Sequence, residues 1–160
     1  MDQFTTILTL GVTVVLCIVA FFILTQADGL PFLSVIIPLL MVALLLGCYA
    51  GSIKAVIVTD GTIIVERKIG ERVYPMNEIT AVQHVTDELD LSLRLFGNGG
   101  LFGYMGWFRS GAIGTYQANA NRRDARILLT FKDGKQLVLS ADQSVELSAD
   151  IAQRLAAYQN

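Results

Sequence analysis

The chain has 160 residues and a formal net charge of −2, which allows a pair of helices and one small domain. Asp2 and Asp28 are the only charged residues before Lys54, so the segment from Lys54 onward balances 12 acidic against 12 basic residues. Nucleic-acid-binding proteins carry a basic surface, so this balance argues against a nucleic-acid partner. It also argues against a domain that is held to lipid by its total charge alone.

Two long apolar segments dominate residues 1–53. No charged residue occurs from Phe4 to Leu24 or from Leu30 to Ile53. A bilayer core of ~30 Å is crossed by about 20 helical residues, so both segments are long enough to span a membrane. The sequence therefore predicts a transmembrane helical hairpin, with spans over residues 4–24 and 31–53.

A short turn joins the two predicted spans and makes them antiparallel. Asp28-Gly29 is a turn signal, and Pro31 suits the first turn of a helix. Every Lys and Arg lies at or after Lys54, and positive residues stay on the cytoplasmic side, so we expect both termini to be cytoplasmic. A signal peptide that is cleaved near Ala27 is the alternative, but the residues before Phe4 include no basic side chain.

Polar and small residues lie near the cytoplasmic ends of both predicted spans. Thr5, Thr9 and Thr13 form a stripe at helical spacing in the first span, and Gly47 and Gly51 are four residues apart in the second. Hydroxyls hydrogen-bond between membrane helices, and small residues let two backbones approach. We expect the two features to face each other and to favour a homo-oligomer, unless the glycines only reflect their frequency in membrane helices.

Beyond Lys54 the apolar residues recur with the two-residue period of β-strands. Asp60-Gly61 and Asp133-Gly134 each join two β-rich runs, which predicts two hairpins. About seven short antiparallel strands are expected in all. From Asp142 the period becomes 3.6, which predicts a C-terminal helix with an apolar face formed by Leu147, Ile151, Leu155 and Tyr158. The expected fold is a small barrel or sandwich closed by that helix.

A stretch rich in glycine and aromatic residues runs from Gly97 to Phe108. Glycine recurs at every third position, with large apolar residues between. Three interpretations are open: a core-filling segment, a loop at the membrane interface where aromatic rings are favoured, or a ligand or peptide groove. The candidate interaction loop consists of Gly97, Gly99, Gly100, Phe102, Tyr104, Trp107 and Phe108. We expect Trp107 at the surface and Phe102 in the core, because tryptophan is rarely buried completely.

Few other residues suggest a site. Arg122, Arg123 and Arg126 form a small basic cluster, which is either a solvated strand end or a contact for anionic headgroups. His84 is the sole histidine, and no partners for a catalytic triad or a zinc site can be named. We therefore expect no catalytic residue, no metal ligand and no cofactor.

Several motifs carry a resemblance to a known family. They are Thr59-Asp60-Gly61, Pro75-Met76-Asn77-Glu78-Ile79, the run from Arg94 to Gly103, Trp107-Phe108, Gly114-Thr115-Tyr116 and Asp133-Gly134-Lys135. Together they resemble the bacterial PH-domain families found after one or more membrane helices. The resemblance covers roughly Lys54 to Tyr158 and implies a PH-like fold over residues 54–160, without an assigned activity. Eukaryotic PH domains bind phosphoinositides through basic residues in the first hairpin, whereas the first turn here is acidic.

Two functional classes remain after these observations. The preferred class is a non-enzymatic, membrane-anchored interaction domain in the bacterial cytoplasmic (inner) membrane. Such a domain binds a protein partner, itself or a lipid surface, and anionic lipid is the lipid expected. The alternative is a small subunit of a membrane enzyme or transporter complex. Neither predicted span contains a charged residue, which a proton or ion path usually needs.

Overall fold

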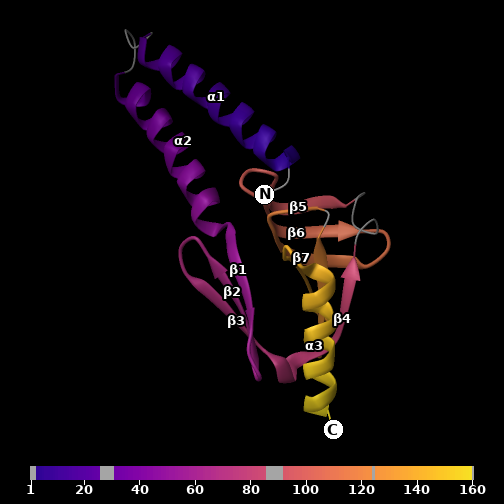
Figure 1. Ribbon diagram of the computed structural model, residues 1–160. Helices are drawn as coiled ribbons and strands as arrows, with labels where there is room; N and C mark the ends of the chain where they lie inside the picture. Colours follow the sequence, from indigo (N-terminus) through magenta and orange to yellow (C-terminus); the bar gives the residue numbers. More distant parts are fainter. Residues whose placement is uncertain (1–2, 26–30, 86–91, 124, 160) are drawn as a thin grey trace.

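In the computed structural model, two long helices lead directly into a domain of two β-sheets and one C-terminal helix (Figure 1). The structure describes residues 3–25, 31–85, 92–123 and 125–159. The turn predicted at Asp28-Gly29 lies outside these ranges. The predicted order of two apolar helices, a mainly-β domain and a C-terminal helix is confirmed.

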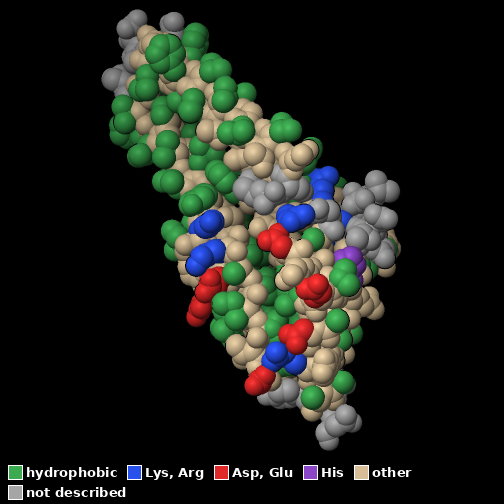
Figure 2. Space-filling view, in the orientation of Figure 1, with side chains coloured by type: hydrophobic (Ala, Val, Ile, Leu, Met, Phe, Trp, Pro, Cys, Tyr) green, Lys and Arg blue, Asp and Glu red, His purple; other side chains and the backbone are tan. Residues whose placement is uncertain are grey.

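The two helices are α1 (Gln3–Thr25) and α2 (Pro31–Gly51). At ~1.5 Å per residue, 23 and 21 residues give lengths of about 34 and 32 Å. Both helices are long and apolar enough to cross a membrane, judged by length and composition. On the face shown in Figure 2, hydrophobic side chains occur along both helices, and no Lys, Arg, Asp or Glu side chain is seen on them. The second helix ends two residues before the predicted limit, because Ile53 already begins the first strand.

The β domain contains two sheets. The first sheet is antiparallel, with the order β1-β2-β3, and consists of β1 (Ile53–Val58), β2 (Thr62–Arg67) and β3 (Glu71–Pro75). A 3-10 turn, η1 (Met76–Glu78), leads to the second sheet. The second sheet has the order β4-β8-β9-β7-β6-β5 and consists of β4 (Ile79–Val85), β5 (Leu93–Gly99), β6 (Tyr104–Ser110), β7 (Gly114–Ala120), β8 (Arg126–Phe131) and β9 (Gln136–Ser140).

Two features of these sheets correct the sequence-based expectation. The described residues form nine strands rather than about seven, and β7 pairs with β9 in parallel. The glycine-aromatic stretch accounts for part of the difference, because it forms the end of β5 and most of β6, and these two strands pair with each other. Gly97 lies opposite Gly106, and a Cβ on Gly106 would approach the carbonyl oxygen of Phe96 to 2.1 Å. Glycine at this crossing lets the two backbones pair closely.

Two apolar clusters stabilise the domain, one on each face of the six-stranded sheet. The larger cluster joins both sheets to α3 (Ser144–Gln159) through Ile63, Val65, Met76, Ile127, Leu129, Leu137, Leu139, Ile151 and Leu155, among others. The smaller cluster lies on the opposite face and includes Val85, Tyr104, Phe108, Tyr116, Leu128 and Val138. The sheets therefore pack as a sandwich and do not close into a barrel.

The C-terminal helix covers one side of this sandwich, as Figure 1 shows. Ile151 and Leu155 enter the larger cluster and Leu147 packs against it, as the period of 3.6 predicts. The side chain of Tyr158 lies outside the described part of the chain. The helix begins at Ser144, two residues later than expected, and the carboxylate of Asp142 accepts a hydrogen bond from Arg122 at 2.8 Å.

Candidate functional site

The first junction between the helices and the β domain lies at the end of α2. Only Ser52 separates α2 from β1, so no flexible linker connects them. The last carbonyls of a helix lack partners within the helix. Here, backbone N–H groups of the β2–β3 turn donate hydrogen bonds at the end of α2. The backbone N–H of Ile69 donates to Ala50 O and that of Lys68 to Ser52 O, both at 3.0 Å. The turn therefore fixes the domain against the helix end.

The second junction is formed by the β5–β6 turn. The backbone N–H of Phe102 donates to Oγ1 of Thr9 in α1 at 3.0 Å. The ring of Phe102 also meets the ring of Tyr49 in α2 edge-on, with centroids 5.5 Å apart. The turn thus contacts both helices at once. Phe102 lies at this junction and belongs to neither apolar cluster, so the expectation that it fills the core is wrong.

Local hydrogen bonds hold the β5–β6 turn in shape. The backbone N–H of Gly100 donates to Gly103 O at 2.8 Å. The side chain of Asn98 accepts from Leu101 N at 3.1 Å and donates to Leu101 O. Phe102 has a φ of 59° and is the one non-glycine residue with positive φ in the described ranges. The turn is therefore a defined structure rather than an irregular loop.

The threonine stripe and the glycines of α2 do not face each other, which corrects a second expectation. Thr5 and Thr9 are buried, but Thr9 binds the β5–β6 turn, and Thr13 donates to its own helix at Thr9 O. A Cβ on Gly47 would meet nothing within 4 Å, and one on Gly51 would meet Met105 of β6. The helices diverge toward the domain in Figure 1, and residues of the domain take the place expected for a helix contact.

A positively charged side chain lies beside the domain-facing end of each helix. Nζ of Lys68 lies 5.9 Å from the centre of the Tyr49 ring, near the end of α2. The guanidinium of Arg123 lies 4.7 Å from the ring centre of Phe4, near the start of α1. On the face shown in Figure 2, Lys and Arg side chains gather next to the apolar helices, and most Asp and Glu side chains lie farther away. This arrangement is typical of the level where lipid headgroups begin.

The structure brings the three arginines of the predicted basic cluster to one cavity but gives each of them different contacts. Arg122 pairs with Asp142, Arg123 contacts aromatic rings, and Arg126 is only 7% exposed. Arg126 therefore does not face a membrane surface, because its strand turns it toward the smaller apolar cluster. All three line a cavity of ≈ 70 Å³ together with Tyr104 and Tyr116. Burial raises the pKa of Tyr116, and a hydrogen bond to Ser92 opposes that shift.

The predicted interaction loop separates into three parts. Gly97 and Gly99 belong to β5, and Gly100 and Phe102 belong to the turn that docks on the helices. The remaining three residues lie in β6, where successive side chains point to opposite faces: Tyr104 and Phe108 are buried, and Trp107 is 40% exposed. Reasoning from sequence did not separate these roles. It also missed Lys68 and Ile69 at the first junction and Leu8 at the second, where the side chain of Leu8 lies next to Gly100.

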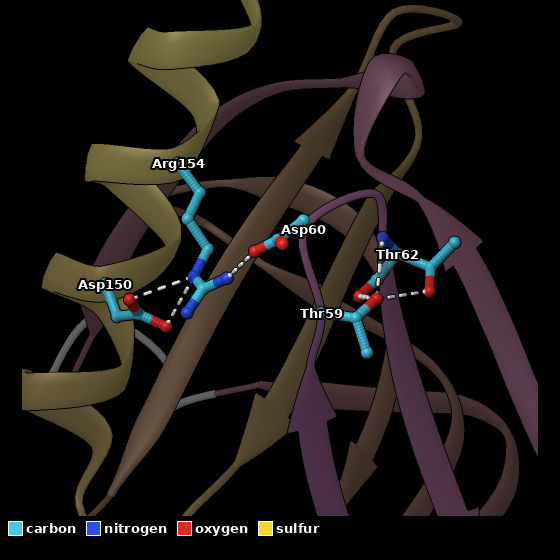
Figure 3. A network of polar contacts seen from close by, with 5 residues as sticks. All are labelled: Thr59, Asp60, Thr62, Asp150 and Arg154. Atoms are coloured by element: carbon cyan, nitrogen blue, oxygen red, sulfur yellow. Dashed lines mark hydrogen bonds and ion pairs between the residues drawn. The ribbon is translucent and has the colours of Figure 1, made fainter.

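The first hairpin turn, between β1 and β2, lies at the end of β1 away from α2. Figure 3 shows that this turn is fastened to α3. Asp60 accepts from Nη1 of Arg154 at 2.5 Å, and Asp150 accepts from Nε of the same side chain at 3.0 Å. The hydrogen bond that Arg154 donates to Asp150 is the main cause of the raised pKa of Arg154. The turn is acidic and points away from the helices, so it offers no basic phosphoinositide site.

The remaining candidates for chemistry have structural partners. His84 is exposed on β4, and its Nε2 lies 3.0 Å from the hydroxyl of Ser144 at the start of α3. Among the residues that the structure describes, no group of three or more His, Cys, Asp or Glu side chains is placed to hold a metal ion. Neither observation adds a catalytic role.

The two packed sheets and the C-terminal helix form a mainly-β domain of the sandwich type. Residues 54–155 match a family model described as a bacterial PH domain. The chain belongs to this family, and the resemblance noted in the sequence is confirmed. The two apolar helices lie outside the matched region. No curated protein and no solved structure matches the chain.

Proposed function

We propose that the chain is an integral membrane protein whose PH-like domain is a non-enzymatic interaction domain on the cytoplasmic side of the bacterial inner membrane. Helices α1 and α2 cross the bilayer as an antiparallel pair, and both termini are cytoplasmic. The domain binds a protein partner, another copy of the chain or the lipid surface. The direct attachment of a PH-like domain to two membrane-length helices carries this proposal.

The two junctions between the helices and the domain fix the orientation of the domain, which supports its role in recognition. A domain on a flexible linker samples many orientations, and a partner must then offset the entropy of ordering it. Here the Ile69–Ala50 and Lys68–Ser52 hydrogen bonds join the domain to α2, and Phe102 joins it to α1. The domain therefore presents one fixed set of surfaces at the membrane, which favours recognition by partners in the same membrane.

The proposed topology is tested with reporter fusions. Alkaline phosphatase is active only outside the cytoplasm, so a fusion after Gly29 should be active and a fusion after Asn160 inactive. A cytoplasmic reporter at the same two positions should give the opposite pattern and serves as the control. Activity of the phosphatase after Asn160 would overturn the orientation, and release of the protein from membranes at alkaline pH would overturn the anchoring.

A further inference from the structure

Strand β5 is unusually exposed for a strand of a folded domain. Among the residues that the structure describes it pairs with β6 alone, and no described strand lies along its other edge. Its apolar side chains are exposed, at 67% for Leu93, 51% for Leu95 and 77% for Phe96. Phe96 lies opposite Trp107 of β6, which places two exposed aromatic side chains side by side. Open, apolar edge strands are normally covered in native proteins, so this surface requires a covering partner.

The charges of this hairpin indicate which partner. Residues 92–110 contain two charged side chains, Arg94 and Arg109, and no acidic residue. Both arginines are exposed, and Leu93 pairs with Arg109 in the register of the two strands. The register places Arg94 opposite the buried Phe108 and Arg109 on the face of Trp107, so the edge carries one cation on each face beside its aliphatic and aromatic side chains. That combination is typical of segments that lie in the interface of a membrane containing anionic lipids.

The position of the hairpin agrees with its chemistry. Its turn contacts Leu8 and Thr9, and Thr9 follows the first residue of α1 by six positions, which is about 9 Å along a helix. In Figure 1, β5 is the strand of the six-stranded sheet beside the start of α1. The open edge thus continues from the apolar surface of the helices.

We propose that the β5–β6 hairpin is a membrane-interface element: the open edge of β5, with Phe96 and Trp107, lies in the headgroup layer, and Arg94 and Arg109 bind anionic phospholipid. This inference rests on the proposed membrane anchoring and adds a specific lipid-binding surface. It also explains why a neutral domain carries an uncovered apolar strand. The lipid surface covers the edge, and the two arginines select the charge of the headgroups.

A tryptophan probe tests the proposal in the full chain. Trp107 is the sole tryptophan, so Trp107→Phe combined with Phe96→Trp moves the probe onto β5. The protein is reconstituted in vesicles of phosphatidylglycerol and phosphatidylcholine that carry bromine at defined acyl positions. We expect strong quenching of the Phe96→Trp probe by bromines close to the headgroups and weak quenching by bromines near the bilayer centre.

The matched control places the probe in the β8–β9 turn. Trp107→Phe combined with Lys135→Trp uses an exposed position near η1, since Lys132 N donates to Glu78 O. This end of the domain is remote from the helices, because η1 packs beside the β1–β2 turn through Met76 N and Gly61 O. The control should show no quenching above that of vesicles without bromine.

The arginines are tested in the same assay. Arg94→Gln with Arg109→Gln, added to the Phe96→Trp probe variant, should lower quenching in vesicles rich in phosphatidylglycerol and leave it nearly unchanged in pure phosphatidylcholine. Lys132→Gln with Lys135→Gln removes two charges from the remote turn and should have no effect.

Three outcomes would overturn the inference. If the Phe96→Trp probe is quenched no more than the Lys135→Trp probe while the protein stays in the vesicles, lipid does not cover β5. If quenching falls as the protein-to-lipid ratio rises, a second copy of the chain covers the edge instead. If the protein leaves the vesicles at alkaline pH, the membrane anchoring itself fails, and the proposed function fails with it.

Discussion

Gly100 and Phe102 show how single residues connect the two parts of this protein. Gly100 has a φ of 128°, and a Cβ there would come within 2.5 Å of Cδ2 of Leu8 in α1. The side chain of Leu8 can move, but a backbone with this φ is strained for any residue with a Cβ. Two residues later, Phe102 contacts both helices. The tightness of the turn therefore decides how closely the domain approaches the helices.

Replacing Gly100 should accordingly weaken the attachment. We expect Gly100→Ala to lower the free energy of unfolding by roughly 1–3 kcal/mol, the usual cost of a residue held in a rare backbone conformation. Thermal unfolding of the full chain in detergent, followed by circular dichroism, measures the change. The control is Gly111→Ala, since a Cβ on Gly111 meets nothing within 4 Å, and its melting temperature should match the parent. Equal melting temperatures for the two variants would show that the turn is not constrained.

At the scale of elements, the glycine-aromatic stretch shows what could be predicted from the sequence and what could not. The hairpins at Asp60-Gly61 and Asp133-Gly134 were predictable because turn chemistry is local. Glycine at every third position obscured the two-residue alternation of β6, in which Tyr104 and Phe108 are buried and Trp107 is exposed. The period alone therefore did not predict that residues 97–108 form the end of β5 and most of β6.

The junctions were beyond prediction for a different reason. Phe102 and Thr9 are 93 residues apart in the chain, and neither residue carries a local signal that they meet. The pattern of small and polar residues in the helices predicted a helix–helix contact, but it did not predict that part of the contact surface would be used by the domain. Exposed Phe96 and buried Arg126 likewise depend on the order of strands in the sheet.

The glycines of α2 make a matched pair for testing this correction. A Cβ on Gly51 would lie 3.0 Å from the sulfur of Met105 in β6, whereas a Cβ on Gly47 would meet nothing within 4 Å. We expect Gly51→Leu to displace Met105 and to lower the melting temperature of the full chain, whereas Gly47→Leu should leave it unchanged or slightly raised, because leucine is the better helix former. A larger loss for Gly47→Leu would indicate that this glycine packs against another helix, in the same chain or in an oligomer.

At the scale of the whole molecule, the domain is fixed to the helices at two separate points. The β2–β3 turn is hydrogen-bonded to the end of α2, and the β5–β6 turn contacts both α1 and α2. One attachment point would leave the domain free to rotate, but two points define its orientation. The proposed function depends on this arrangement, because a domain of fixed orientation would present one set of surfaces to the proposed membrane.

A disulfide cross-link between α1 and the β5–β6 turn tests this arrangement most directly. In full-length protein with Cys17→Ala and Cys48→Ala, the pair Thr9→Cys and Phe102→Cys is oxidised in native membranes, and the pair Thr9→Cys and Lys135→Cys serves as the control. Since Oγ1 of Thr9 lies 3.0 Å from the backbone nitrogen of Phe102, we predict rapid and nearly complete cross-linking of the first pair and none of the second. Thiols at positions 9 and 102 that stay reactive and unlinked, or that link no faster than the control pair, would contradict the docked domain.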